Sequence, residues 1–303
     1  MASDTTIGVP DDNIGDPSVS GNLLQVFGNQ SFEDYARKKK RRLRTRRIVR
    51  GGISIIVLLV LWEVMSKAYD LELLLPRPLT VLDNVLTTLF LGHERWLYGP
   101  NIYVHLQNSF FRAMTGFLLA AAVGIPLGLI IGRVTVVREF VLPIIKGVYP
   151  VPGIAWIPLA ILWFGLSDKA VVFVVFMTTV FMVFFNTEAG ARSISPVVLD
   201  AGRCFGARGL AMFFRVILPA TFPYIITGLR VGLGTSWRMI VAGEMLASQE
   251  GIGFILMESR YLFRAVDLMT AMILISIIGY VTEKLIVGTI EKRTTEMWEV
   301  QTV

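Results

Sequence analysis

The 303-residue sequence predicts an all-α polytopic membrane protein with six transmembrane helices and both termini in the cytoplasm. Composition is the first reason: hydrophobic residues make up 54% of the chain and charged residues 17%, and the mean hydropathy is +0.62. These values lie on the apolar side of an ordinary soluble domain. The second reason is that apolar residues gather in runs of about twenty, the length that a helix needs to cross a bilayer.

Six apolar runs justify the six helices. The predicted spans are 51–69, 109–132, 141–164, 170–189, 221–246 and 267–290. The third run contains three prolines within the sequence VYPVPGIAWIPLAILWF. The segments 70–108 and 247–266 connect spans and are expected to be outer loops.

Basic residues predict the orientation of the spans. Residues 37–50, RKKKRRLRTRRIVR, hold ten Lys or Arg in fourteen positions directly before the first span. Under the positive-inside rule this segment is cytoplasmic, and so are the basic loops after the second and fourth spans and the C-terminal end. Such a segment also attracts anionic lipid head groups. The positive charge is too concentrated to form a nucleic-acid-binding face.

The regions outside the spans differ in composition. Residues 1–36 carry six acidic residues and no Lys or Arg, and they lack the basic start and apolar core of a signal peptide. We therefore expect a disordered acidic cytoplasmic tail over 1–36 and a basic juxtamembrane segment over 37–50. The transmembrane domain is expected over 51–290 and a cytoplasmic C-terminal tail over 291–303.

The cytoplasmic loop 190–219 carries local signals for two short helices. Ser195 followed by Pro196 is typical of an N-cap and a first helical position. Gly206 can end this helix in a left-handed conformation. A second short helix is expected over 208–217, up to the next proline. Because Arg208 and Arg215 flank the apolar residues Met212, Phe213 and Phe214, the loop suits either an interfacial helix on lipid or a surface that docks another protein.

The spacing within this loop favours docking. Asp200-Ala201-Gly202, three residues, Gly206, nine residues and Val216-Ile217-Leu218-Pro219 resemble the EAA motif of ABC importer permeases, EAA-x3-G-x9-I-x-L-P. Asp replaces Glu, Gly replaces the second Ala, and Val replaces Ile. The resemblance implies a coupling loop that docks on an ATPase subunit. Its residues are Asp200, Ala201, Gly202, Gly206, Leu218 and Pro219.

The resemblance covers about residues 51–298. The permeases that import taurine, aliphatic sulfonates, nitrate or bicarbonate are similar in four stretches: LLPRPLTV (74–81), NSFFRAMTGF (108–117), PVPGIAWIPLAILWFG (150–165) and FPYIITGLRVGLGTSWRMIVAGEML (222–246). The N-terminal extension before residue 51 is longer than that family's usual start, so the resemblance implies no role for it.

For this chain the family implies a type I, MetI-like importer fold in the inner membrane and a small anionic substrate, such as a sulfonate, nitrate, bicarbonate or carboxylate. It also implies a second permease copy, an ABC ATPase subunit that carries ATP and Mg²⁺, and a periplasmic or lipid-anchored solute-binding protein.

Prolines in the third span are candidates for the translocation path. Pro150, Pro152 and Pro158 either kink the span or mark broken backbone, which is tolerated at membrane depth where it lines a cavity. In the second case Trp156 would face or gate the path.

The fifth span carries charged residues on one helical face. Arg230, Gly234, Trp237, Val241 and Glu244 follow one another at spacings of three or four. An intramembrane charge costs on the order of 2.5–3.5 kcal/mol at a helix centre, so these charges need partners or water. They either form structural pairs, for example with Glu63 or Glu188, or line a route for an anion. Arg238 and Arg112 are open to the same two interpretations.

Other function classes lack their signatures. No G-x-x-x-x-G-K-[ST] phosphate-binding loop occurs, so ATP must be hydrolysed by another chain. His93 and His105 form no H-E-x-x-H motif, no G-x-S-x-G occurs, and Cys204 is the single cysteine. We expect no enzyme, metal site or cofactor in this chain. An ion-driven secondary carrier or channel is the alternative, although no inverted repeat relates 51–164 to 170–290.

Overall fold

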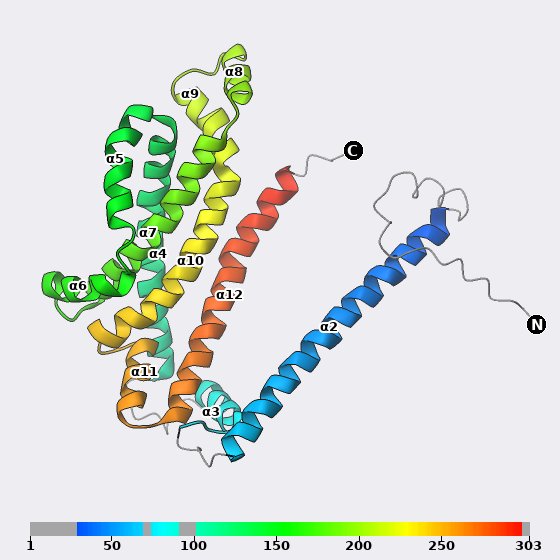
Figure 1. Cartoon of the computed structure of the whole chain (residues 1–303), viewed down its shortest axis with the longest axis vertical. Helices are drawn as coiled ribbons and strands as arrows, with labels where there is room; N and C mark the ends of the chain where they lie inside the picture. Colours follow the sequence, from blue (N-terminus) through cyan, green and yellow to red (C-terminus); the bar gives the residue numbers. More distant parts are fainter. Residues whose placement is uncertain (1–28, 69–73, 91–100, 299–303) are drawn as a thin grey trace, which may run out of the picture. The chain divides into compact units, whose positions relative to one another are not determined.

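The computed structural model describes residues 29–68, 74–90 and 101–298, and every regular element in these residues is a helix (Figure 1). The chain divides after Tyr69 into two compact units. The all-α prediction is confirmed.

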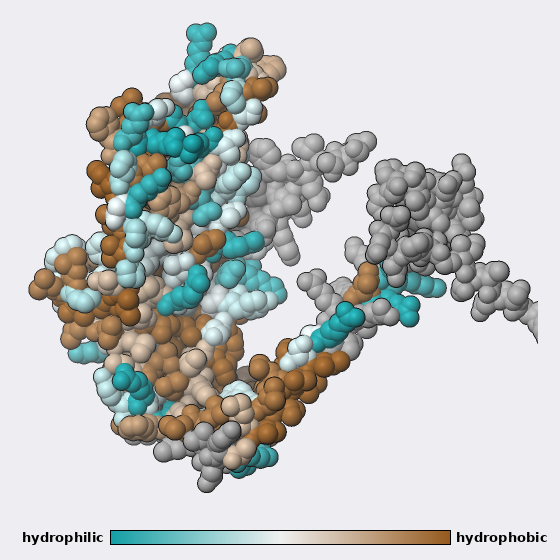
Figure 2. Space-filling view, viewed as in Figure 1, coloured by the Kyte–Doolittle hydropathy of each residue, from teal (hydrophilic) through white to brown (hydrophobic). Residues whose placement is uncertain are grey.

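The first unit contains one long helix, α2, Asn29–Ala68. Its apolar part, Arg50–Ala68, is long enough to cross a membrane and forms the brown stretch of this helix in Figure 2. The basic segment and the first span are therefore one unbroken helix.

Helix α2 begins inside the segment 1–36, which the sequence predicts to be a disordered tail. Residues 29–36 are helical, and residues 1–28 lie outside the described residues.

Four long helices form the body of the second unit. They are α4, Ile102–Arg133; α7, Asp168–Ser193; α10, Leu218–Ala247; and α12, Ala265–Trp298. Each contains a stretch that is apolar and long enough to span a membrane, which in α12 ends at Ile286. The predicted C-terminal tail is helical as far as Trp298, and residues 299–303 lie outside the described residues.

The third predicted span is broken. In place of one helix over 141–164, α5 covers Thr135–Val148, a 3₁₀ turn η1 covers Gly153–Trp156, and α6 covers Ile157–Phe164. The two parts meet at 90°. Pro150 and Pro152 cause the break because neither can donate a backbone hydrogen bond and each disfavours a helical residue before it. The described residues thus hold five candidate spans, or six if the bent pair counts as one.

The two predicted outer loops are also partly helical. The first contains α3, Pro78–Phe90, and the start of α4, and the second contains α11, Ile252–Tyr261. In Figure 1, α3 and α11 lie at one end of the second unit, and the loop that joins α7 to α10 lies at the other.

Small residues let α4 pack closely on α7. Gly124, Gly128 and Gly132 recur every four residues along α4. A Cβ added at Gly128 would lie 2.7 Å from the Cβ of Thr187, and one at Gly132 would lie 2.7 Å from the Cβ of Ala191. The helices are therefore as close as their backbones allow, which is how membrane helices gain packing energy without a hydrophobic driving force.

The interface between α7 and α10 is apolar with one polar link at its centre. The side chains of Val171, Val174, Val175, Leu233 and Ile240 are fully buried there. Among them, the hydroxyls of Thr179 and Ser236 lie 2.9 Å apart and are both buried. The three helices α4, α7 and α10 form the core of the unit.

Candidate functional site

The loop between α7 and α10 begins as its sequence predicts. Helix α8, Pro196–Cys204, starts at Ser195, whose hydroxyl accepts a hydrogen bond from the Val197 amide at 3.3 Å. The helix ends at Gly206, which has φ +79°. The amide of Gly206 donates to the Arg203 carbonyl and that of Ala207 to the Gly202 carbonyl, both at 2.9 Å. These bonds satisfy the last carbonyls of the helix, and the left-handed residue is the one where glycine is preferred.

The second half of the loop differs from the prediction of a separate helix over 208–217. Helix α9, Leu210–Met212, continues through a π-helical segment η2, Phe213–Ile217, directly into α10. The Leu218 amide donates to the Phe213 carbonyl, a π-type bond. Pro219 does not end the helix, because it lies in the first turn of α10 immediately after this wider turn.

The motif residues in this loop are divided between two faces. Asp200 and Ala201 are exposed, and Asp200 pairs with Arg203 at 2.8 Å on the surface. Gly202 is buried, and a Cβ there would lie 3.0 Å from Val216 and 3.3 Å from Met212. Gly202 therefore lets α8 rest on α9 and on the π-helical segment η2. Gly206 is exposed, and Leu218 and Pro219 are half-buried.

Apolar side chains project from the same loop into the surroundings. Phe205 is 92% exposed, Leu210 77% and Val197 74%. Hydrophilic and apolar residues adjoin at this end of the molecule in Figure 2. An exposed apolar patch beside charged side chains is typical of a surface that binds another protein.

The three arginines of the predicted spans have different environments. Arg112 is 6% exposed and pairs with the fully buried Glu244 at 2.9 Å and with Asp168 at 2.7 Å. Arg230 and Arg238 are exposed on α10. Arg112 thus has a structural partner that the sequence did not identify. The other two remain candidates for the path.

The surroundings of Arg238 are open. Its Nε donates to the Gly234 carbonyl at 3.1 Å and its Nη2 to the Thr235 hydroxyl at 3.3 Å, both on its own helix. Within the described part of the chain no carboxylate forms an ion pair with it. A Cβ on Gly234 would meet nothing within 4 Å. This face of α10 therefore carries a cation and is not covered by the rest of the described residues.

The predicted stripe on α10 is not one accessible face. Trp237 and Glu244 are buried, whereas Arg230 is exposed and Val241 is half-buried. Trp237 packs against Phe110 of α4, and a Cβ on Gly279 of α12 would lie 3.4 Å from its ring. Neighbouring helices cover the stripe towards its C-terminal end, which residue spacing on one helix cannot reveal.

The expected ion-pair partners are also used elsewhere. Glu63 pairs with Lys67 at 2.7 Å within α2, and Glu188 of α7 lies 3.7 Å from Arg138 of α5. The cation that pairs with Glu244 is Arg112 of α4.

The broken third span reaches the centre of the bundle. Pro150 and Pro152 are exposed, and Trp156 is half-buried with its ring edge-on to Phe173. Gly153 lies directly against Thr178 of α7 and Met239 of α10, where a Cβ would overlap the Thr178 side chain. The backbone break thus adjoins α10 one residue from Arg238.

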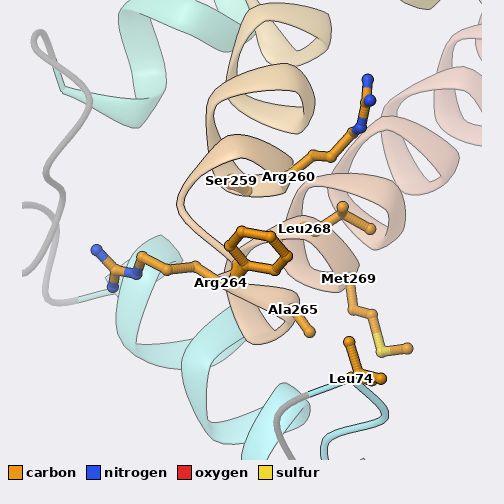
Figure 3. A pocket seen from close by; sticks show the side chains of 8 residues that line it. Leu74, Ser259, Arg260, Arg264, Ala265, Leu268 and Met269 are labelled. Atoms are coloured by element: carbon orange, nitrogen blue, oxygen red, sulfur yellow. The ribbon is translucent and has the colours of Figure 1, made fainter.

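A pocket of about 260 Å³ lies between the end of α11 and the start of α12 (Figure 3). Its lining is mainly apolar. Arg260 and Arg264 adjoin it, but their guanidinium groups point in opposite directions, and Arg264 pairs with Asp267 at 2.7 Å. The two cations therefore do not converge on one anion.

The described residues contain no group of three His, Cys, Asp or Glu side chains that could hold a metal ion. His105 was expected in an outer loop, but it lies buried in α4, where its Nδ1 accepts a hydrogen bond from the Gly251 amide at 2.9 Å. His93 lies outside the described residues, and Cys204 is exposed.

Comparison with known proteins identifies this architecture. Residues 124–296, more than half of the chain, match the family model of the binding-protein-dependent transport system inner membrane component. An ABC transporter permease protein of Methanocaldococcus jannaschii is 35% identical over 74% of this chain and 83% of its own length. The taurine transport permease TauC of Escherichia coli is 33% identical over 77% of this chain and 83% of its own length. The nitrate import permease NrtB of Synechocystis is 30% identical over 79% of this chain and 87% of its own length.

Solved structures share the fold. The MetNI methionine ABC transporter matches with a TM-score of 0.57 at 17% identity, over 64% of this chain and 95% of its own. A bacterial alginate ABC transporter, in complex with its alginate-bound periplasmic protein, matches with a TM-score of 0.55 at 16% identity, over 82% and 97%.

The chain belongs to the family of binding-protein-dependent transport system inner membrane components. It is the transmembrane permease subunit of an ABC importer with a MetI-type fold, a multi-pass protein of the inner membrane. It is not itself catalytic, since the ATPase of such a transporter is a separate subunit.

Proposed function

We propose that this permease imports a small anion, of the size of a sulfonate, nitrate, bicarbonate or short carboxylate. Arg238 carries the proposal: a cation on an uncovered face of a membrane helix, without a carboxylate partner in the described residues. An anion that leaves water for low-dielectric surroundings needs a compensating charge along its route. Relatives named for taurine and nitrate support this class of substrate.

The proposed path runs along the open face of α10, past Arg230 and Arg238, and beside the backbone break at Pro150 and Pro152. Trp156 lies next to this break. One permease of this size encloses no path by itself, so a second copy related by a twofold axis is the economical arrangement. In such a dimer the uncovered faces of the two α10 helices would line the route together.

The coupling loop, which we define as residues 196–219, is proposed to dock on an ATPase subunit that binds ATP and Mg²⁺. Its exposed apolar side chains and the Asp200–Arg203 pair form the contact surface. We place this loop, and both termini, in the cytoplasm because ten basic residues precede the first span. A periplasmic or lipid-anchored solute-binding protein would deliver the anion at the opposite end. The alginate transporter supports this arrangement, since its solved structure is a complex with an alginate-bound periplasmic protein.

Reconstituted transporter tests the substrate class. The chain, together with its ATPase and solute-binding protein, is placed in vesicles and offered labelled taurine, nitrate, bicarbonate and an uncharged solute of similar size. We expect ATP-dependent uptake of at least one anion and none of the uncharged solute. Uptake of the uncharged solute alone would refute the proposal.

A further inference from the structure

A network of buried hydrogen bonds joins α4 and α10 to the turn 248–253, at the end of the bundle opposite the coupling loop. Three successive amides begin α11, and each has a side-chain acceptor. The Gly251 amide donates to His105 Nδ1 at 2.9 Å, that of Ile252 to Ser109 Oγ at 2.9 Å, and that of Gly253 to Glu244 Oε2 at 3.0 Å. The first amides of a helix have no partner within it, so these acceptors complete α11.

Glu244 is the centre of this network. Its Oε2 also accepts from the Ser109 hydroxyl at 2.8 Å, and its Oε1 accepts from Arg112 Nη1 at 2.9 Å. A carboxylate at the start of a helix is stabilised by the helix dipole, and the arginine balances its charge in this buried position. Every described donor to Glu244 comes from α4 or from the start of α11.

Arg112 extends the network to two further points. Its Nη1 donates to the Glu250 carbonyl at 2.7 Å, inside the turn. Its Nε donates to Asp168 at 2.8 Å, at the first residue of α7. Asp168 is 71% exposed, whereas Arg112 and Glu244 are buried. A single guanidinium therefore links α4, α7, α10 and the turn.

Two glycines allow the turn to approach Glu244. Gly251 has φ +114°, and a Cβ there would overlap the Glu244 carboxylate. A Cβ on Gly253 would lie 2.5 Å from the Val241 carbonyl and 2.7 Å from the Glu244 Cβ. The turn thus lies against α10 with no room for a side chain at positions 251 and 253, and it cannot shift without breaking the hydrogen bonds.

The same three helices are joined at two other levels. The glycines of α4 contact α7 at the coupling-loop end, and Thr179 meets Ser236 near the centre. With Arg112 and Glu244 at the far end, α4, α7 and α10 are fastened along their whole length. The coupling loop connects α7 to α10, so its displacement acts on a rigid group of helices rather than on one helix.

We propose that Arg112 and Glu244 are positioning residues of the transport cycle. They hold the turn 248–253 and α11 on the ends of α4 and α10, so that a movement of the coupling loop displaces this turn on the far side of the membrane. The proposal rests on the proposed function in one respect, namely that the coupling loop receives the movement of an ATPase.

Hydrogen exchange on the assembled transporter tests the first part of the proposal, that the network holds the turn 248–253 and α11 on the ends of α4 and α10. Ser109→Ala removes the acceptor of the Ile252 amide and leaves the Arg112–Glu244 pair in place. Glu244→Gln keeps the shape and removes the charge. Loss of one buried partner should make exchange in residues 248–257 about tenfold faster or more. Exchange in the coupling loop should not change.

Ser276→Ala is the matched control. Its hydroxyl donates at 2.7 Å to the Met272 carbonyl within α12 and is not part of the hydrogen-bond network. Unchanged exchange at 248–257 in both Ser109→Ala and Glu244→Gln would overturn the proposal, and so would faster exchange spread evenly over the bundle, since the network would then serve general stability.

The ratio of anion uptake to ATP hydrolysed tests the second part of the proposal, that movement of the coupling loop displaces the turn 248–253. With taurine and nitrate as probes, this ratio should fall about fivefold or more in Ser109→Ala and Glu244→Gln, while basal hydrolysis and ATPase binding persist. An unchanged ratio of uptake to ATP hydrolysed, in a variant whose residues 248–257 exchange faster, would overturn the proposal. It would also be overturned if Glu244→Gln failed to assemble while Ser109→Ala behaved like the wild type. If the coupling loop itself does not bind the ATPase, Gly206→Val will show that separately.

Discussion

Gly128 and Thr187 set the distance between α4 and α7. A Cβ on Gly128 would lie 2.7 Å from the Thr187 Cβ and 2.9 Å from the Phe184 carbonyl. Real Cβ atoms do not approach backbone so closely, so any larger residue at position 128 must push the two helices apart. The packing of the core therefore depends on the absence of one side chain.

Gly128→Val should lower the stability of the folded protein. Overpacking of this kind costs about 1–3 kcal/mol, and here backbone atoms must move. The measurement is the Tm of the purified permease in detergent. Gly288→Val is the control, because a Cβ at Gly288 of α12 meets nothing within 4 Å. Equal Tm values for the two variants would show that the close contact between α4 and α7 does not determine the stability of the protein.

Gly206→Val should leave the protein inserted and abolish transport. A β-branched residue at φ +79° is strained by about 1–3 kcal/mol, so the loop should leave this conformation and lose its docking geometry. Copurification of the ATPase and ligand-stimulated ATP hydrolysis are the measurements. Gly147→Val is the control, since both glycines have open space around a Cβ and only Gly206 has positive φ. Normal stimulated hydrolysis in Gly206→Val would remove this loop from the coupling mechanism.

Asp200→Lys should weaken ATPase binding about tenfold or more, whereas Asp200→Glu should bind normally. Reversal of an interface charge places like charges together, and Glu restores the residue usual in the EAA motif. Binding is measured as the ATPase copurified at increasing salt. Glu139→Lys supplies the same reversal on the exposed surface of α5, outside the coupling loop. If both reversals weaken binding equally, Asp200 has no specific role.

Arg238→Gln should reduce anion uptake about tenfold or more without loss of assembly, and Arg238→Lys should keep part of the activity because it keeps the charge. Uptake in vesicles and copurification of the ATPase separate the two effects. Arg260→Gln serves for comparison, since Arg260 is exposed on α11, where it lies over the Tyr261 ring. Intact uptake of every anion tested would place the route elsewhere.

Reporter fusions should confirm the orientation of the chain. A reporter that is active only in the cytoplasm should work after Val303 and fail after Gly99. Gly190, which the sequence suggested as a loop site, lies within α7 against Tyr224, so the third fusion belongs at the exposed Gly209. Activity after Gly99 with silence after Val303 would reverse the orientation.

Local signals in the sequence were sufficient for much of the fold. Ser195, Pro196 and Gly206 define α8 because an N-cap and a left-handed end act within a few residues. The long helices could be predicted from the lengths of the apolar runs alone. By contrast, Pro150 and Pro152 suggested a kink, but the 90° bend depends on how α5 packs on α4 and how η1 and α6 pack on α7 and α10.

The Arg112–Glu244 pair could not be predicted, because 132 residues separate its members. Sequence spacing indicates which residues share a face of one helix, but not which helix covers that face. For this reason Glu244 was grouped with Arg230, although one is buried and the other is exposed. The glycines at 251 and 253 were the available signal, since a turn that contacts another backbone requires them.

Because of the π-helical segment Phe213–Ile217, the number of residues between Gly206 and Pro219 determines how the coupling loop is oriented relative to α10. A π turn contains one residue more than an α turn, and one residue corresponds to about 100° of rotation around a helix. Deletion of a single residue from 213–217 would restore an unbroken α-helical ladder and swing Leu210 and α8 by roughly that angle around the axis of α10. The segment thus sets the direction, around the axis of α10, in which the coupling loop points. The nine-residue spacing in the motif is then a constraint on direction as well as on length.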